Sequence, residues 1–421
     1  MSALSYLEKL LDGVDVQWKT IGEVISRTSN IKWREATRSY RYVDLTSVDI
    51  ETKKITETTE IIANNAPSRA QKLLEENDVI FATTRPTQQR FCLIDSEYSG
   101  EVASTGYCVL RAKQDEVLPK WILHWISTSY FKKYVEENQS GSAYPAISDA
   151  RVKECLIPIP CPDNPEKSLA IQSEIVRILD TFTALTAELT AELTARKKQY
   201  NYYRDQLLSF DEGEAEWKTL GDVTKKWYSG GTPTAGKAEY YENGDIPWLR
   251  TQEVKFSDID STEIKITQAA LKNSAAKWIP ENCVIIAISG ATAGRSAINK
   301  IPLTTNQHCG CLEIDDTKAL YRYVFHWVSF NYENIKSLGQ GARGDLNSTI
   351  IKNFKLPIPY ATAPDKSLEE QARIVEILDK FDTLTNSINE GLPREIELRQ
   401  KQYEYYRDML FSFPKQEEPE A

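Results

Sequence analysis

The chain has little of what catalysis usually requires. It has only three histidines, His124, His308 and His326, although histidine is the commonest general acid–base side chain. It lacks a G-x-x-x-x-G-K-[ST] phosphate loop, a strand-linked G-x-G-x-x-G and an H-E-x-x-H zinc motif. It also lacks the Asp/Asn-Pro-Pro-aromatic tetrapeptide of adenine methyltransferases. His124 and His326 each precede a tryptophan, a repeated context that favours core packing. The sequence therefore predicts a protein that is not itself an enzyme.

Long apolar runs are missing as well. No run approaches the ~18–20 residues that span a bilayer, and the first residues show no signal-peptide pattern. The cysteines number seven, which favours reduced thiols and a cytoplasmic location over a disulfide framework. Cys309 and Cys311 follow His308, but no second Cys/His pair stands at zinc spacing. A strand with small apolar residues is favoured there over a metal site.

A basic surplus is also absent. Acidic residues outnumber basic ones by 61 to 51, giving a formal charge of −10 at pH 7. A stand-alone DNA-binding domain is usually basic, because neutralising phosphates supplies most of its affinity. This leaves two alternatives: the chain binds no nucleic acid, or it reads base edges while partner subunits hold the DNA backbone.

What the chain does contain is an internal duplication. Trp18 is matched by Trp217, and Pro158 is matched by Pro357, both at an offset of 199 residues. A constant offset over such separated landmarks indicates two copies of one structural unit. Between the landmarks, each copy has compact apolar runs and a helical segment, 121–135 in the first and 321–336 in the second. Each copy is therefore expected to be an α+β domain.

A long helical pattern follows each copy, at 167–210 and 366–413. Apolar residues recur there at steps of three and four, which is typical of a coiled-coil seam. The first pattern contains two TAEL units, whose spacer residues are Thr186, Leu189, Thr190 and Leu193. Gly391 and Pro393 should interrupt the second pattern, with Pro393 able to start a new helical segment. We expect the two helices to pair antiparallel as a strut.

These patterns predict an α+β fold in which two similar target-recognition domains are separated by two long antiparallel helices, with pseudo-two-fold symmetry. The expected bounds are 1–160 for the first domain and 161–215 for the central helix. The second domain is expected at 216–359, followed by the C-terminal helix and acidic tail at 360–421. Two similar heads that face one way would suit a duplex whose major groove returns every ~34–36 Å.

Base-reading residues are expected in loops, where the two copies differ most. Arginine suits guanine O6/N7, glutamine suits adenine N6/N7, and glycine-rich loops allow close approach to phosphate. The competing interpretation is solvated loops and ordinary turns. The candidates in the first copy are Arg34, Arg38, Arg41, Arg85, Gln88, Gln89, Arg90, Ser142 and Tyr144. The candidates in the second copy are Ser229, Gly230, Thr232, Trp248, Arg250, Thr251, Thr292, Arg295, Asn306, Gln307 and Arg343.

The second copy carries the segments WKTLGDV, SGGTP, GDIPWLR, SGATAGR and TNQ before a proline-rich exit into LEEQARIVEILDKFD. Together with the TAEL units, this series resembles the specificity subunit of type I restriction–modification enzymes, in the branch with TAEL repeats. The first copy departs from it, with SRTSN in place of SGGTP and TTRPTQQR in place of SGATAGR.

The resemblance implies a non-catalytic subunit that reads a split, asymmetric double-stranded DNA target, one half-site per domain. It implies two methyltransferase subunits that use S-adenosylmethionine, and two restriction subunits that use ATP and magnesium. This chain would bind no cofactor, metal or membrane itself. The alternative is a coiled-coil scaffold that binds proteins only and adds no sequence preference.

Overall fold

The computed structural model describes residues 9–11, 13–341, 344–387 and 390–414. The candidate Arg343 and residues 415–421 of the acidic tail lie outside these ranges. The chain divides into two compact units: unit 1 takes in residues 1–192 and 394–421, and unit 2 takes in residues 193–393.

Unit 1 is built from short strands that form three small sheets. Its strands are β1 (Val16–Thr20), β2 (Ile25–Ser26), β3 (Tyr40–Val43), β4 (Thr59–Ile61), β5 (Ala70–Leu73), β6 (Val79–Ala82), β7 (Phe91–Leu93), β8 (Val102–Ser104), β9 (Tyr107–Ala112) and β10 (Leu156–Pro160). β1 pairs with β10, and the larger sheets have the orders β2-β9-β6-β7 and β4-β3-β8-β5. The short helices are α2 (Pro119–Ile126), α3 (Ser129–Asn138) and α4 (Asp149–Glu154).

Unit 2 repeats this plan. Its strands are β11 (Ala215–Thr219), β12 (Thr224–Ser229), β13 (Ile246–Leu249), β14 (Asp258–Ile259), β15 (Ile264–Ile266), β16 (Val284–Ala287), β17 (Ser296–Asn299), β18 (Thr304–Thr305), β19 (Cys309–Ile314) and β20 (Lys355–Pro359). β11 pairs with β20, and the larger sheets have the orders β12-β19-β16-β17-β14 and β15-β13-β18. The short helices are α6 (Ala238–Tyr241), α7 (Gln268–Lys272), α8 (Tyr321–Phe330), α9 (Tyr332–Ser337) and α10 (Ser348–Asn353).

Corresponding strands of the two units pair in the same way. Trp18 lies opposite Pro158 in the β1–β10 pair, and Trp217 lies opposite Pro357 in the β11–β20 pair. β3 runs parallel to β8, and β13 runs parallel to β18. The α+β fold and the duplication predicted from the 199-residue offset are therefore confirmed.

The segments predicted to be helical at 121–135 and 321–336 are helical, but each is divided into two short helices by an interruption that the pattern did not indicate. In unit 1, α2 ends at Ile126 and α3 begins at Ser129. The hydroxyl of Thr128 accepts a hydrogen bond from Phe131 N, and this N-cap starts a new helix. In unit 2, α8 ends at Phe330, and Asn331 precedes α9.

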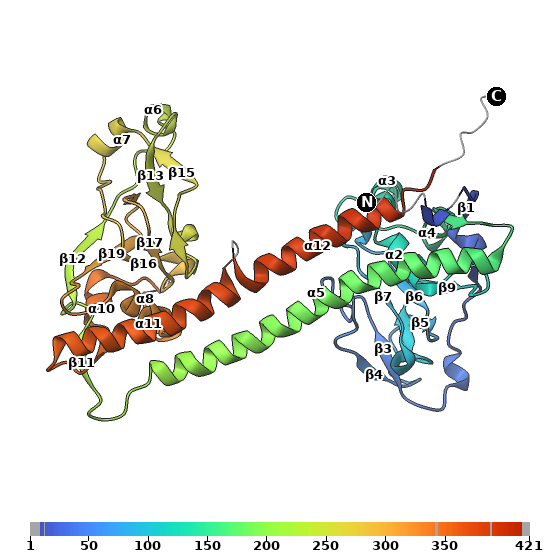
Figure 1. Cartoon of the computed structure of the whole chain (residues 1–421), viewed down its shortest axis with the longest axis horizontal. Helices are drawn as coiled ribbons and strands as arrows, with labels where there is room; N and C mark the ends of the chain where they lie inside the picture. The colour runs from blue at the N-terminus through green and yellow to red at the C-terminus, as the bar shows by residue number, and fades with distance from the viewer. Residues whose placement is uncertain (1–8, 12, 342–343, 388–389, 415–421) are drawn as a thin grey trace. The chain divides into compact units, whose positions relative to one another are not determined.

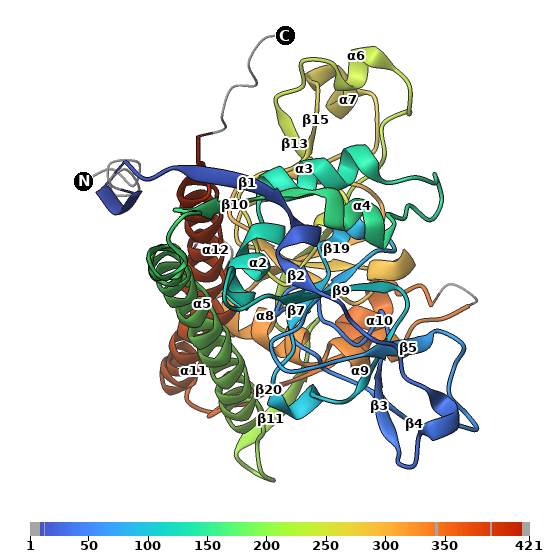
Figure 2. The same ribbon diagram turned by 90° about the vertical axis from the view of Figure 1, so that its right-hand side faces the viewer.

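The long helices have the predicted extent and the predicted interruption. α5 (Pro165–Leu207) is one continuous helix whose residues divide between the units at 192/193. α11 (Pro364–Asn386) ends before α12 (Gly391–Leu410), which has Pro393 in its first turn, where proline is tolerated. Within unit 1, one part of α5 runs antiparallel beside α12 (Figures 1 and 2). Within unit 2, the other part of α5 runs antiparallel beside α11.

Aromatic stacking joins the paired helices inside each unit. In unit 1, the rings of Phe182 and Tyr406 stack with their centroids 5.4 Å apart. In unit 2, Phe381 stacks with Tyr200 at 6.0 Å and with Tyr203 at 5.6 Å. Phe182 and Phe381 are themselves related by the 199-residue offset. Offset aromatic pairs of this kind are worth ~0.5–1.5 kcal/mol beyond the area they bury.

A fully buried glutamine attaches each domain to its long helix. In unit 1, Gln172 Oε1 accepts from Leu118 N at 2.9 Å, and its Nε2 donates to Glu116 O at 3.0 Å. In unit 2, Gln371 Oε1 accepts from Leu320 N at 2.9 Å, and its Nε2 donates to Lys318 O at 3.4 Å. Both side chains are 0% exposed. Each amide therefore satisfies backbone groups of a loop that the helix covers.

A histidine–aspartate pair repeats beside each glutamine. His124 Nε2 lies 3.1 Å from Asp180 Oδ1, and His326 Nε2 lies 2.6 Å from Asp379 Oδ1. Both rings are only 3% exposed. Hydrogen bonds from these histidines lower the pKa of both aspartates against the opposing effect of burial. The two histidines are thus part of the domain–helix contact, as the repeated His-Trp context suggested.

Candidate nucleic-acid interface

Three loops in each unit are joined by the same two backbone hydrogen bonds. In unit 1, Thr83 N donates to Gly106 O at 2.8 Å, and Ile147 N donates to Thr83 O at 2.9 Å. In unit 2, Ile288 N donates to His308 O at 2.9 Å, and Leu346 N donates to Ile288 O at 2.8 Å. We call these loops the platform of each unit. The platform of unit 1 consists of residues 83–90, 104–106 and 139–147. The platform of unit 2 consists of residues 288–295, residues 305–308 and a third loop whose described parts are 338–341 and 344–346.

In the loop 83–90 of the unit 1 platform, two residues adopt the left-handed backbone conformation. Arg85 has φ 49° and Gln89 has φ 53°, on either side of the 3-10 turn η3 (Pro86–Gln88). Left-handed conformation costs a non-glycine residue ~1–3 kcal/mol and tends to occur at functional sites. Arg85 N donates to Pro145 O at 2.7 Å, so the neighbouring loop 139–147 helps to hold this conformation.

Side chains from this loop face both outward and inward. Arg85 is exposed, and its guanidinium lies 5.2 Å from the ring of Tyr144, which is 72% exposed. Arg90 donates to Val48 O, and Lys53 donates to Gln89 O. Burial lowers the pKa of Lys53 to about 8. Within the described part of the chain, neither polar atom of the Gln89 amide has a hydrogen-bond partner. Gln88 and Ser142 are exposed at the same surface loops.

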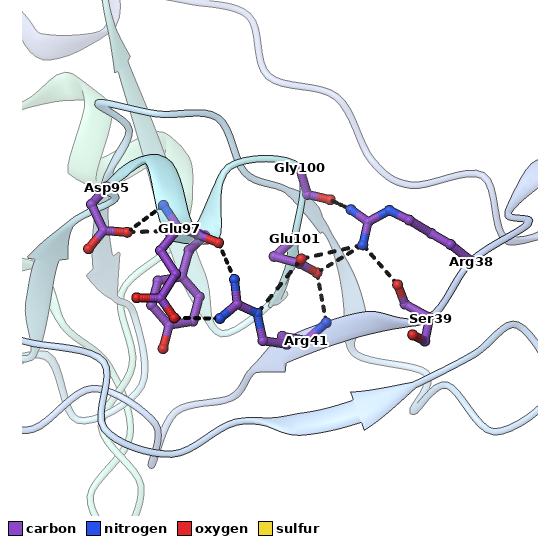
Figure 3. A network of polar contacts seen from close by, with 8 residues as sticks. Arg38, Ser39, Arg41, Asp95, Glu97, Gly100 and Glu101 are labelled. Carbon is purple, nitrogen blue, oxygen red and sulfur yellow. Dashed lines mark hydrogen bonds and ion pairs between the residues drawn. The ribbon is translucent and has the colours of Figure 1, made fainter.

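The three candidate arginines near β3, Arg34, Arg38 and Arg41, differ in the hydrogen bonds and ion pairs that they make within the protein. Glu101, which is only 9% exposed, accepts from Arg41 N at 2.7 Å and pairs with Arg38 Nη1 at 3.3 Å (Figure 3). Arg41 also pairs with Glu97 at 2.7 Å, and this hydrogen bond raises the pKa of Arg41. Arg34, in η2 (Trp33–Glu35), is exposed and makes no ion pair among the described residues.

In unit 2, the loop after β12 approaches the platform at Gly230. A Cβ at Gly230 would lie 1.8 Å from Thr305 O, so only glycine fits there. Trp248 is buried, with 5% exposure, and its Nε1 donates to Gly231 O at 3.2 Å. Arg250 pairs with Glu263 and with Glu253, which follows Thr251 in η5 (Thr251–Glu253). The structure therefore places Trp248 beneath the loop and holds Arg250 in ion pairs, while Ser229 ends β12 and is half-buried.

The loop 288–295 corresponds in length and backbone bonding to the loop 83–90. Ala82 N donates to Arg90 O, and Ala287 N donates to Arg295 O, both at 2.9 Å. Its turn is η6 (Gly290–Thr292), with Gly290 at φ 75°. Thr292 is half-buried. Unlike Arg90, Arg295 has a buried Nε with no hydrogen-bond partner among the described residues.

A chain of polar side chains joins the loops of unit 2. Thr232 Oγ1 donates to Gln307 Oε1 at 2.7 Å, and Gln307 Nε2 lies 3.2 Å from His308 Nε2. His308 Nδ1 lies 2.6 Å from Ser289 Oγ. Asn306 Oδ1 accepts from His308 N at 3.0 Å, which fixes the turn between β18 and β19. Sequence reasoning weighed His308 only as a metal ligand and missed it as a platform residue. Its position directly after Asn306 and Gln307 was the available signal.

The cysteines beside His308 face the other way. Cys309 and Cys311 are fully buried in a hydrophobic cluster, and burial raises the pKa of the Cys309 thiol to about 12. Within the described residues, no group of three His, Cys, Asp or Glu side chains could hold a metal ion. Among the described helices, none is both long enough and apolar enough to cross a membrane.

Comparison with known proteins gives consistent matches along the chain. A family model described as "Type I restriction modification DNA specificity domain" matches residues 14–196 and 213–398. The type I restriction enzyme EcoR124I/EcoR124II specificity subunit of Escherichia coli is 44% identical over 426 residues, covering 99% of each chain. The type I restriction enzyme EcoprrI specificity subunit, also from Escherichia coli, is 33% identical over 410 residues, covering 93% of each.

Solved structures share the fold. A chain from a type I restriction–modification system matches with a TM-score of 0.60 and 21% identity, covering 94% of this chain and 97% of that one. The S subunit of a type I restriction–modification system from M. genitalium matches with a TM-score of 0.58 and 15% identity, covering 96% and 98%.

Arg41 takes part in the network of Figure 3, whereas Arg34 is exposed and makes no ion pair among the described residues. We predict that Arg41→Ala lowers the free energy of unfolding of the full chain by about 1–2 kcal/mol, because it removes the side-chain hydrogen bonds to the carboxylate and carbonyl of Glu97 and the ion pair with Glu101. The matched change Arg34→Ala should alter it by less than about 0.5 kcal/mol. Urea unfolding followed by circular dichroism measures both. Equal effects of the two substitutions would show that the network does not stabilise the fold.

Proposed function

Because the chain belongs to the family of type I restriction–modification DNA specificity subunits, we propose that it reads a bipartite, asymmetric DNA target with one half-site per unit. The chain is the non-catalytic subunit of its complex and directs partner subunits to methylate adenine N6 or to restrict the DNA. The observation that carries this proposal is the pair of platforms. They are built by identical backbone hydrogen bonds but carry different side chains.

The partners are part of the same proposal. Two methyltransferase subunits that use S-adenosylmethionine bind the duplicated helices, and two restriction subunits that use ATP and magnesium join them in the cytoplasm. Support comes from the repetition of the helix pair in both units and from the net charge of −10. An acidic chain has little means of holding DNA phosphates alone, so partner subunits would supply most backbone contacts.

Within this proposal, residues 1–160 and 216–359 are the recognition domains. The segment 161–215 carries the central helix, and the segment 360–421 carries the C-terminal helix and the acidic tail. Two groups stand out among the candidate residues. Arg85, Gln88, Tyr144, Gln307 and Arg295 lie on or beside the platforms and are the residues that we propose contact DNA. Arg38, Arg41, Thr232, Trp248 and Arg250 would instead position the loops and their side chains, because the protein itself already binds their polar groups.

Modular recognition is tested by exchanging residues 217–355 for the same segment of another family member. We expect one half-site to change and the other to stay, because each platform is assembled within one unit. The measurement is sequencing of modified adenines in cells that carry the hybrid and its methyltransferase partner. A matched exchange within 16–156 should change the opposite half-site.

Two results would contradict the proposal. One is that both half-sites change together after either exchange. The other is that the unaltered chain, bound to its methyltransferase partner, adds no sequence preference in a gel shift at stated salt. The second result would favour the protein-only scaffold.

We also propose that α5 sets the distance between half-sites. The TAEL residues Thr186, Leu189, Thr190 and Leu193 lie within this uninterrupted helix. Thr186 Oγ1 and Thr190 Oγ1 donate to the carbonyls of Phe182 and Thr186, so each threonine hydroxyl bonds to the preceding turn of the helix. One further TAEL unit would add about 6 Å of helix and rotate the residues beyond the insertion by roughly 40°.

Insertion of a third TAEL unit after Leu193 should lengthen the spacer of the target by one to two base pairs and leave both half-sites unchanged. The control Thr190→Ala keeps the helix length and should keep the spacer. Mapping of modified adenines reads out both variants. An unchanged spacer together with altered half-sites would refute the ruler role of α5.

A further inference from the structure

The amide of Gln307 is held by a hydrogen-bonding neighbour on each side. An amide oxygen carries no hydrogen, so Thr232 must donate to Gln307 Oε1 across 2.7 Å. An amide nitrogen does not accept, so His308 Nε2 must accept from Gln307 Nε2 across 3.2 Å. Reversing the amide would require Thr232 Oγ1 to accept and His308 Nε2 to carry the ring proton, so both hydrogen bonds would have to change direction together. Thr232 and His308 therefore hold the amide between them, with Oε1 toward Thr232 and Nε2 toward His308.

This orientation of the amide also sets the tautomer of the His308 ring. Because His308 Nε2 accepts, its proton lies on Nδ1, which donates to Ser289 Oγ at 2.6 Å. The His308 backbone is pinned as well, since its N donates to Asn306 Oδ1 at 3.0 Å and its O accepts from Ile288 N at 2.9 Å. Asn306 is itself only 8% exposed. The loops after β12, β16 and β18 thus contribute one connected chain of hydrogen bonds.

These bonds leave part of the Gln307 amide unused. Nε2 retains one N–H, Oε1 retains one lone pair, and the residue is exposed. In the major groove, adenine presents an acceptor at N7 beside a donor at N6. Guanine presents two acceptors, cytosine only a donor, and thymine only an acceptor. Adenine is therefore the one base whose edge can satisfy both unused groups.

Resting on the function proposed above, we infer that Gln307 reads an adenine in the half-site of unit 2 and that His308 is its positioning residue. Gln307 donates to adenine N7 and accepts from adenine N6. His308 and Thr232 hold the amide in its reading orientation before DNA arrives. Unit 1 has no equivalent, because Thr105 and Gly106 fill the corresponding loop between β8 and β9.

The test uses the full chain reconstituted with its methyltransferase partner and unmethylated duplexes of the mapped target. Each adenine of the half-site that changes on exchange of 217–355 is replaced singly by 7-deazaadenine, which lacks the N7 acceptor. We expect one position at which this replacement weakens binding by about 10- to 100-fold. Gln307→Ala should weaken binding of the unmodified duplex similarly and abolish the effect of 7-deazaadenine at that position alone. Gln268→Ala, outside the platform, should change neither.

The positioning role has its own readout. His308→Leu should reduce the preference for adenine over guanine at that position and leave the other positions unchanged. His308→Gln, whose Oε1 can accept from Gln307 Nε2, should restore the preference. Gln307→Glu should shift the preference toward cytosine, because a carboxylate accepts from cytosine N4. Equal thermal unfolding midpoints establish that the variants are folded.

The failures are distinguishable. If the unaltered complex shows no bipartite preference, the proposed function fails. If it shows that preference but Gln307→Ala keeps every 7-deazaadenine effect, the inference alone fails. It also fails if Gln307→Ala weakens target and unrelated DNA equally, since that result identifies a phosphate contact.

Discussion

The rest of each unit depends on the hydrogen bonds of one buried glutamine amide, which lies on α5 in unit 1 and on α11 in unit 2. Gln172 and Gln371 are completely shielded from water, and each satisfies a backbone N–H and a backbone C=O of one loop, which precedes α2 in unit 1 and α8 in unit 2. Removing such a side chain leaves buried polar groups unpaired, at ~1–3 kcal/mol each. The strands, platforms and helix pair of each unit are arranged around this attachment.

Duplication explains why this contact occurs twice, and divergence explains how the two copies can differ in function. The contacts between domain and helix are shared: glutamine to backbone, and histidine to aspartate. The backbone bonds of the platforms are shared as well. The side chains on the platforms are not. Unit 1 presents Arg85 and Tyr144, whereas unit 2 presents Gln307 and His308. A constant frame with variable surface groups is what a two-part recognition subunit needs.

Much of the fold was predictable from the sequence, because its signals are local or periodic. The offset of 199 residues indicated the duplication, and Pro393 marked the start of the last helix. The break at Thr128 was missed because a single capping hydroxyl outweighed an otherwise helical pattern. The roles of Arg38 and Arg41 were beyond sequence reasoning, since Glu101 and Glu97 lie about sixty residues away in the chain. Only the tertiary fold brings these charges together.

Hydrogen exchange measured by mass spectrometry on the full chain tests the central contact most directly. Gln172→Ala should accelerate exchange in the segment 118–126 by about tenfold or more, because the N–H of Leu118 loses its acceptor. Gln371→Ala should do the same for the segment 320–330, because the N–H of Leu320 loses its acceptor. Each substitution should leave the other unit unchanged. Unaltered exchange in both segments, or acceleration of both by either substitution, would contradict the view that one buried glutamine attaches each domain to its helix.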